Sequence, residues 1–223
     1  QQALVSSYEE CVSFIEKTQL TTYIIKPINS AGSDDVYKIP AQNLSLLKQR
    51  CDSVIGKKNK LGFINEKILI QEFLPGDEYV IDIVSLNGVH KLAACWKYMK
   101  TSLPQGDFVY LGMLLQDTND PIVQQAFTYT TKVLDALKIK NYSSHSELIF
   151  NPEKNDLALV ECGARPHGGM GMFLPAVKRV IGYSVLDLLE SALLGTKDQH
   201  YPNSQQRLFD EYDALYPTID NLF

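Results

Sequence analysis

The sequence predicts an α+β fold in which helices lie on antiparallel sheets. Two β-hairpins carry this prediction. In one, the dipeptide Asn87-Gly88 forms a tight turn after an apolar strand over residues 79–84. In the other, polar residues 151–156 separate two apolar runs, residues 145–150 and 157–165. Amphipathic segments with capping residues predict the helices that cover the sheets.

The composition is that of an ordinary globular protein, and it excludes several classes of partner. Of 223 residues, 45% are hydrophobic and 21% are charged, with a formal net charge of −5. No basic block with interleaved aromatic residues occurs, so we expect no nucleic-acid partner. No apolar run reaches the length of a membrane span and no signal peptide opens the chain, so we expect no membrane partner.

The cysteines and the first residue add two further expectations. Cys11, Cys51, Cys95 and Cys162 are scattered and lack the spacing of metal ligands. We therefore expect small core residues in a reducing compartment, which points to the cytoplasm. The chain begins with Gln rather than Met, which leads us to expect a fragment of a longer protein.

The first third of the chain predicts two helices on either side of a buried strand. Ser7 and Glu10 form a capping-box signature at the start of the first helix. Asn43 caps the second helix, which carries an apolar stripe. Residues 23–25 are apolar with β preference and predict a buried strand that ends at Pro27.

A lysine and a loop of small residues follow this strand. Lys26 at the strand's end would point to solvent if structural and to an anion if functional, and the loop that follows favours the second interpretation. The loop consists of the small residues Ser30, Ala31, Gly32 and Ser33. The backbone N–H groups of such a loop can close around phosphate oxygens. Asp34 and Asp35 do not suit phosphate, so we expect them to point away.

The middle of the chain predicts a bend and a change of lobe. Residues 68–70 predict a buried strand, and residues 73–76 predict a bend or hinge. An antiparallel strand pair then ends at Lys97, where we expect the chain to pass from one small sheet to the next. Asp120 starts a core helix, and Ser184 caps a last helix that Gly195 ends.

Two glutamates lie at opposite chain ends of the second hairpin. Antiparallel pairing brings Glu147 and Glu161 together at one end of a sheet. Two adjacent carboxylates repel unless a cation lies between them, and hard oxygen ligands suit Mg²⁺. Arg165 and a glycine-rich loop follow at once. The hairpin therefore indicates either a Mg²⁺–nucleotide site or a surface hairpin with solvated acids.

The order of these features resembles the ATP-grasp superfamily. It runs from Lys26-Pro27 and the small-residue loop to Gln-Glu-Phe-Leu-Pro-Gly-Asp-Glu at residues 71–78, a strand pair ending in Lys97, and Glu-x-x-x-Arg at residues 161–165. The chain is most similar to the carboxylate–amine ligase branch, such as bacterial L-amino acid ligases. The resemblance covers residues 7–195 and implies an ATP-grasp fold, with two lobes that grip a nucleotide.

The resemblance implies roles for individual residues. Arg165 and Lys97 would be catalytic, and Glu147 and Glu161 would bind Mg²⁺ or Mn²⁺. The ATP-binding residues would be Lys26, Ser30, Ala31, Gly32, Ser33, Gln71, Glu72, Phe73, Leu74, Glu78 and Lys97. Among them, residues 71–74 would bind adenine and Glu78 the ribose hydroxyls. His167, Gly168 and Gly169 would contact the substrate.

Two positions leave alternatives open. Many family members carry Asn two residues after the second metal glutamate, where this chain has Gly163. Either water fills the vacant metal position, which Mg²⁺ accepts readily, or metal binding is weakened. His145 precedes Glu147 by two residues on the same strand face. It would be either a partner of the metal carboxylate or a satisfied polar strand residue.

The resemblance also implies a function. We expect an ATP-dependent ligase that joins a carboxylate and an amine, both small substrates such as amino acids, through an acyl phosphate. A nucleotide-binding module without catalysis, or a purine-pathway or carboxylase-type enzyme, remains the alternative.

The expected organisation places a first lobe at residues 1–73, a second lobe at residues 74–195 and a further segment at residues 196–223. That last segment would contain a short helix over residues 207–216. Family members carry an N-terminal α/β domain before these lobes, so this piece alone could be inactive. A homodimer is left open.

Overall fold

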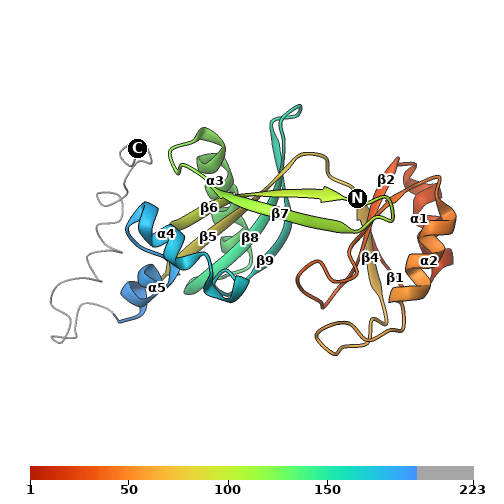
Figure 1. Ribbon diagram of the computed structural model, residues 1–223, viewed down its shortest axis with the longest axis horizontal. Helices are drawn as coiled ribbons and strands as arrows, with labels where there is room; N and C mark the ends of the chain where they lie inside the picture. The colour runs from red at the N-terminus through yellow and green to blue at the C-terminus, as the bar shows by residue number, and fades with distance from the viewer. Residues whose placement is uncertain (195–223) are drawn as a thin grey trace. The chain divides into compact units, whose positions relative to one another are not determined.

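The computed structural model describes residues 1–194 and contains two compact units (Figure 1). The first unit comprises Gln1–Leu74 and Lys100–Gly112, and the second comprises Pro75–Met99 and the described chain from Met113 onward. Each unit combines a sheet with helices, which confirms the predicted α+β class. Gly195, residues 196–223 and the helix predicted over 207–216 lie outside the described residues.

The first unit is a four-stranded antiparallel sheet with two helices on one face (Figure 1). The strand order is β1-β4-β2-β3, formed by β1 (Gln2–Val5), β2 (Thr22–Pro27), β3 (Tyr37–Pro40) and β4 (Ile68–Glu72). The helices are α1 (Tyr8–Thr18) and α2 (Leu44–Val54). Both predicted caps are confirmed, because Ser7 Oγ accepts from Glu10 N–H at 3.2 Å and Asn43 Oδ1 accepts from Leu46 N–H at 3.0 Å.

Strand alternation divides the first sheet into an apolar face and an open face. Tyr23 and Ile25 of β2 are fully buried and pack in one core with residues of α1 and α2. The alternate residue of β2, Lys26, therefore points to the other face, and so do Lys38 of β3 and Gln71 of β4. The open face of this sheet consequently carries two lysines.

The larger sheet has five strands (Figure 1) and belongs to the second unit, except for the parts of two strands within residues 100–112, which belong to the first. Its order is β7-β6-β5-β8-β9, formed by β5 (Asp77–Leu86), β6 (Val89–Ser102), β7 (Phe108–Leu115), β8 (Tyr142–Asn151) and β9 (Asp156–Gly163). The helices are α3 (Pro121–Ala136), α4 (Leu174–Ile181) and α5 (Val185–Leu194), with a 3₁₀ turn at Gly169–Gly171. Helices α3 and α5 both contact β5 at the centre of the sheet.

Both predicted hairpins are present. β5 and β6 pair antiparallel around Asn87 and Gly88, whose φ values of 54° and 81° are the left-handed values that a tight hairpin turn requires. β8 and β9 pair antiparallel from Asn151↔Asp156 to His145↔Gly163. Turn chemistry visible in the sequence therefore fixed the two strand pairs that matter for the site.

The extent of the first unit differs from the predicted lobes. Residues 100–112, which the sequence assigned to the second lobe, pack with the first unit. Lys38 N–H donates to Gly106 O at 2.9 Å, and Arg50 pairs with Asp107 at 2.9 Å. These contacts join residues more than fifty positions apart, so local sequence patterns do not reveal them.

Two further expectations concern membrane-spanning helices and the cysteines. Among the described residues, no helix has both the length and the hydrophobicity to cross a membrane. The predicted character of the cysteines is largely confirmed, since Cys11, Cys51 and Cys95 are buried free thiols and Cys162 is a half-buried one.

Candidate active site

The two glutamates of the β8–β9 hairpin face each other across the strands. Glu147 and Glu161 are register partners, so their side chains project from the same face of the second sheet. A shift of register beyond Glu147 leaves Val160 as an extra residue in β9, a bulge of the kind found beside functional sites. The side chain of Glu147 is 15% exposed. The predicted juxtaposition of the two acids is therefore present.

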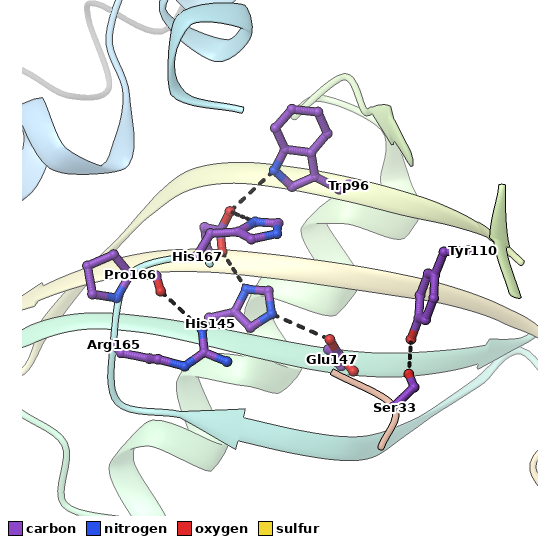
Figure 2. A network of polar contacts seen from close by, with 9 residues as sticks. Ser33, Trp96, Tyr110, His145, Glu147, Arg165, Pro166 and His167 are labelled. Atoms are coloured by element: carbon purple, nitrogen blue, oxygen red, sulfur yellow. Dashed lines mark hydrogen bonds and ion pairs between the residues drawn. The ribbon is translucent and has the colours of Figure 1, made fainter. Parts of the chain in front are cut away.

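His145 lies beside this carboxylate pair (Figure 2). Its Nε2 is 3.4 Å from Glu147 Oε1, and its Nδ1 is 3.0 Å from Asp82 Oδ1. Of the two interpretations that the sequence left open, the structure selects the first, because His145 is a partner of the predicted metal carboxylate. The imidazole contacts one carboxylate on each side.

Asp82 is the most deeply buried acid of the site, and no sequence motif singles it out. Its side chain is 3% exposed and accepts from His145 Nδ1 and His167 Nδ1, each at 3.0 Å, and from Trp96 Nε1 at 3.3 Å. Because an ionised carboxylate can only accept, all three groups donate to it. The available signal was one acid in the apolar run of β5, since a buried charge requires partners.

The pKa values of this group reflect burial and pairing together. Burial alone would raise the pKa of Asp82, but the hydrogen bonds from His145 and His167 outweigh it and hold the pKa below its usual range. Burial alone would lower the pKa of His145, but its bonds to Asp82 and Glu147 raise the pKa to about 9. At neutral pH the ring is consequently an imidazolium between two carboxylates.

Arg165 lies in the loop that follows β9 (Figure 2). Its Nη1 donates to Pro166 O at 3.1 Å, and its backbone N–H donates to Gly163 O at 2.9 Å. A Cβ on Gly163 would lie 3.5 Å from Arg165 Cγ and Nε. A side chain at position 163 would therefore lie against the arginine.

The predicted substrate residues lie in the same loop. Gly169 has φ +68°, and a Cβ there would meet the Phe173 ring at 2.3 Å, so only glycine fits this close approach. His167 turns its Nδ1 to the buried Asp82 and its side chain is only 8% exposed. A direct substrate contact by His167 is thus disfavoured, whereas Gly168 and Gly169 keep their predicted role as an expectation.

Lys97 does not join the carboxylate pair. In β6, Lys97 is the register partner of Tyr79. The neighbouring residue Trp96 pairs with Val80, and Val80 pairs with Glu147 on its other side. Strand alternation therefore puts Lys97 on the opposite face of the sheet from Glu147. Its Nζ donates to Asp77 at 2.7 Å, a hydrogen bond that raises the pKa of Lys97. Lys97 therefore lies on a different sheet face from Glu147, and its predicted catalytic and phosphate-binding roles stay predictions.

Glu78 occupies the same face as Glu147. Glu78 pairs with Ile149 and Val80 pairs with Glu147 across β5 and β8. Because Glu78 and Val80 are two residues apart on β5, their side chains and that of Glu147 project to the same face. Glu78 is 3% exposed, an unusual setting for an acid. Its predicted contact with the ribose hydroxyls remains a prediction.

The predicted adenine-binding residues lie in the first unit, where β4 ends. Gln71 and Phe73 alternate onto the open face with Lys38, whose Nζ lies 4.0 Å from the centroid of the Phe73 ring. Glu72 is instead the register partner of the fully buried Tyr23, so its side chain projects to the other face of the sheet. The N–H groups of Glu72 and Phe73 already donate to Gln1 O and Thr22 O, which leaves Leu74 as the candidate backbone donor for an adenine edge.

The small-residue loop has left-handed backbone at Gly32 (φ 66°) and Ser33 (φ 57°). Ser30 Oγ donates to Asp34 at 2.7 Å, and Lys60 N–H donates to the same carboxylate at 2.9 Å. Asp34 is therefore turned into the protein, as expected. The Ser30 hydroxyl is engaged by that acid, which the sequence did not indicate.

Ser33 Oγ donates to Tyr110 OH at 3.1 Å, a bond within the first unit (Figure 2). Lys26 lies on the open face of the same sheet, the orientation that a role in anion binding requires. Lys38, which no sequence pattern singled out, shares that face.

The sequence profile of the ATP-grasp domain matches residues 20–173, and the chain belongs to this family. Its members bind ATP and a divalent metal.

Individual relatives are similar over parts of their length. Dapdiamide A synthase from Enterobacter agglomerans is 30% identical over 171 residues, which cover 77% of this chain and 39% of that protein. The L-amino acid ligase from Bacillus licheniformis superposes with a TM-score of 0.61 at 18% identity, over 91% of this chain and 47% of that one. An N5-carboxyaminoimidazole synthase from Aspergillus clavatus gives 0.62 at 11% identity, over 87% and 46%. The chain thus spans less than half of each relative.

Proposed function

We propose that this protein is an ATP-dependent carboxylate–amine ligase that joins amino acids through an acyl phosphate. The observation that carries the proposal is the facing pair Glu147 and Glu161 with Arg165 four residues further on. Phosphoryl transfer needs positioning and charge neutralisation around a triphosphate more than it needs covalent chemistry from the protein. The two carboxylates would hold a metal ion that positions the phosphates. The metal ion and the arginine would neutralise their negative charge.

The donor set at the hairpin fits Mg²⁺ or Mn²⁺. Glu147 and Glu161 offer carboxylate oxygens on one sheet face, and hard cations prefer such ligands. The ion would neutralise charge on the nucleotide phosphates when bound. Asp82, His145 and His167 also have metal-binding side chains, with ligand atoms within 4.8 Å of one another. That group fits a metal less well, because Asp82 already accepts three hydrogen bonds.

The reaction we propose has two steps. A carboxylate oxygen of the first substrate attacks the γ-phosphorus of ATP, and the bond from this phosphorus to the bridging oxygen of ADP breaks. The amine of the second substrate then attacks the acyl carbon, loses a proton, and phosphate leaves. Arg165 would neutralise the charge that builds on the phosphoryl oxygens in both steps, where a fixed cation is most effective.

Amino acids are the substrate class that the relatives favour. The name of the relative from Bacillus licheniformis states that it ligates L-amino acids. The identity to dapdiamide A synthase is the highest among the proteins compared above. The superpositions on the L-amino acid ligase and on N5-carboxyaminoimidazole synthase, at 18% and 11% identity, both reflect the fold alone, so neither decides the substrate class. We also propose a cytoplasmic location, consistent with the free thiols of the described residues.

The test is release of ADP and phosphate from ATP by the full-length protein with a panel of amino acid pairs. We expect release that requires both an amine and a carboxylate, with a dipeptide as product. ATP binding without release in the presence of any pair would contradict the proposal and support a nucleotide-binding module. Release that requires an aminoimidazole substrate instead would support the purine-pathway alternative.

Arg165→Ala is the sharpest variant for this proposal. Loss of one charge-stabilising donor typically lowers kcat by about 10²–10³-fold. Arg179→Ala is the matched control, because Arg179 is an exposed arginine in the last turn of α4. Near-normal turnover by Arg165→Ala, with Arg179→Ala as the reference, would refute the role given to Arg165.

A further inference from the structure

Two chain segments of the proposed site converge on one buried carboxylate. His145 lies two residues before Glu147 on β8, and His167 lies two residues after Arg165 in the following loop. Both rings donate through Nδ1 to Asp82 of β5, at 3.0 Å each, and they use different oxygens of this carboxylate. Asp82 therefore touches the strand of the predicted metal ligand and the loop of the predicted catalytic arginine.

On the strand side, the hydrogen-bonded contacts of Asp82 continue through His145 to the predicted metal ligand Glu147. His145 bonds Asp82 through Nδ1 and approaches Glu147 Oε1 through Nε2 at 3.4 Å (Figure 2). Asp82 and His145 are also register partners across β5 and β8, so the backbones of the two strands fix their separation. The orientation of the Glu147 carboxylate is thereby coupled to that of Asp82.

On the loop side, the ring of His167 is enclosed. It lies 5.0 Å from the Phe173 ring and 6.2 Å from the Trp96 ring, between centroids. Trp96 and Phe173 contact each other at 5.6 Å, and Trp96 Nε1 donates to Asp82 at 3.3 Å. The loop that carries Arg165 is thus held by a hydrogen bond and by ring packing around one acid.

We propose that Asp82 is a positioning residue that fixes Glu147 and Arg165 relative to one another, through His145 and His167 respectively. This role rests on the proposed ligase function. It assigns His167 to holding the loop rather than to contacting the substrate. A shift of the loop by about 1 Å would misplace the arginine, and misplacement on this scale can lower a rate by about 10²-fold.

His167→Leu and His167→Asn form the test pair. Asn carries an amide N–H close to the position of the Nδ1 donor, whereas Leu has no donor. In the full-length protein, we expect His167→Leu to lower kcat by about 10²-fold, with little change in the KM for ATP. We expect His167→Asn to recover most of the loss, which a merely space-filling role would not produce.

Two further readouts do not depend on turnover. Trp96 is the single tryptophan of the chain, so its fluorescence reports the packing of the loop against Asp82. We expect a red-shifted, more easily quenched emission in His167→Leu but not in His167→Asn. We also expect Asp82→Asn to weaken Mn²⁺ binding, measured by electron paramagnetic resonance. His90→Ala is the control, since His90 belongs to a separate group.

The outcomes separate this proposal from the proposed function. Wild-type kcat and Trp96 emission in His167→Leu, or equal impairment of the Leu and Asn variants, would overturn it. If the wild-type protein ligates nothing, the fluorescence and Mn²⁺ results still decide the positioning role. Zn²⁺ that stabilises the wild-type protein but not Asp82→Asn would assign a metal to this group instead, and would also overturn the proposal.

Discussion

Two histidine–carboxylate groups lie along strand β5, and they differ in burial. In the first, Asp82 is 3% exposed and accepts from His145, His167 and Trp96. In the second, Ser85 Oγ lies 2.7 Å from His90 Nδ1, and His90 Nε2 lies 3.3 Å from Asp135, whose side chain is 70% exposed. The side-chain types are nearly the same, but the carboxylates have opposite solvation.

The comparison shows that composition alone does not identify a functional group. A serine, a histidine and an aspartate in contact resemble a nucleophilic triad, yet Ser85 is 1% exposed and has no access for a substrate. The group joins the β5–β6 hairpin to α3. The Asp82 group, in contrast, touches residues next to the predicted metal and phosphate ligands. Burial and neighbourhood distinguish the two.

Removing the buried carboxylate should have the largest effect on stability. Asp82→Ala leaves His145 and His167 without their shared acceptor in a dry environment. Breaking a buried pair of this kind typically costs about 3–5 kcal/mol. Urea unfolding of the wild-type and variant proteins, monitored by circular dichroism, would measure the change in the free energy of unfolding. A loss below about 1 kcal/mol, the surface-pair value, would mean that Asp82 is no more important than Asp135.

The pH dependence of stability should single out His145. Its folded pKa of about 9 lies above the ordinary value of 6.5, so protonation favours the folded state. Its contribution is complete below about pH 6.5 and is lost as pH rises through about 9, on the order of 3 kcal/mol in total. Metal-free protein in EDTA should lose stability over this interval, and His145→Gln should not. A flat profile for the wild-type protein would contradict the imidazolium assignment.

His90→Ala should have a smaller effect on stability. The side chain of His90 is 6% exposed and bonds Ser85, so its removal loses a hydrogen bond and some packing. We expect a loss of about 1–2 kcal/mol, with the Trp96 emission the same as in the wild-type protein. A changed Trp96 emission would show that the two groups on β5 are coupled rather than separate.

Asp135→Ala should have the smallest effect. A contact at an exposed carboxylate typically contributes about 0–1 kcal/mol, and salt weakens its electrostatic part. We expect a change in the free energy of unfolding within this range. The change should disappear in about 1 M salt, where charges are screened beyond about 3 Å. A larger, salt-independent loss, measured by the same urea unfolding, would place Asp135 with the buried carboxylates.

Local patterns in the sequence were sufficient for the elements and for the acid pair. Ser7, Asn43 and Asp120 cap helices as their side chains predicted, because capping is a contact within one turn. The Asn87-Gly88 turn and the polar segment before Asp156 set the hairpins. From the second hairpin, the pairing of Glu147 with Glu161 follows directly.

The sequence did not indicate which sheet face Lys97 occupies, because the face of a strand residue depends on register. A register shift between Asp82 and Ile83 interrupts the β5–β6 pairing, and beyond it Lys97 pairs with Tyr79. A shift of one residue would reverse the face of every side chain in β6. Register is set by the pairing of whole strands and not by local composition.

The fold class, the helix starts, the two hairpins and the acid pair can be predicted from the sequence, since each depends on residues close in the chain. The placement of residues 100–112 in the first unit and the contacts of Asp82 with His145 and His167 depend on tertiary packing. Asp82 lies 63 residues from His145 and 85 from His167. Such contacts exist only once strands and loops have packed, because burial of the charge and formation of its hydrogen bonds occur together.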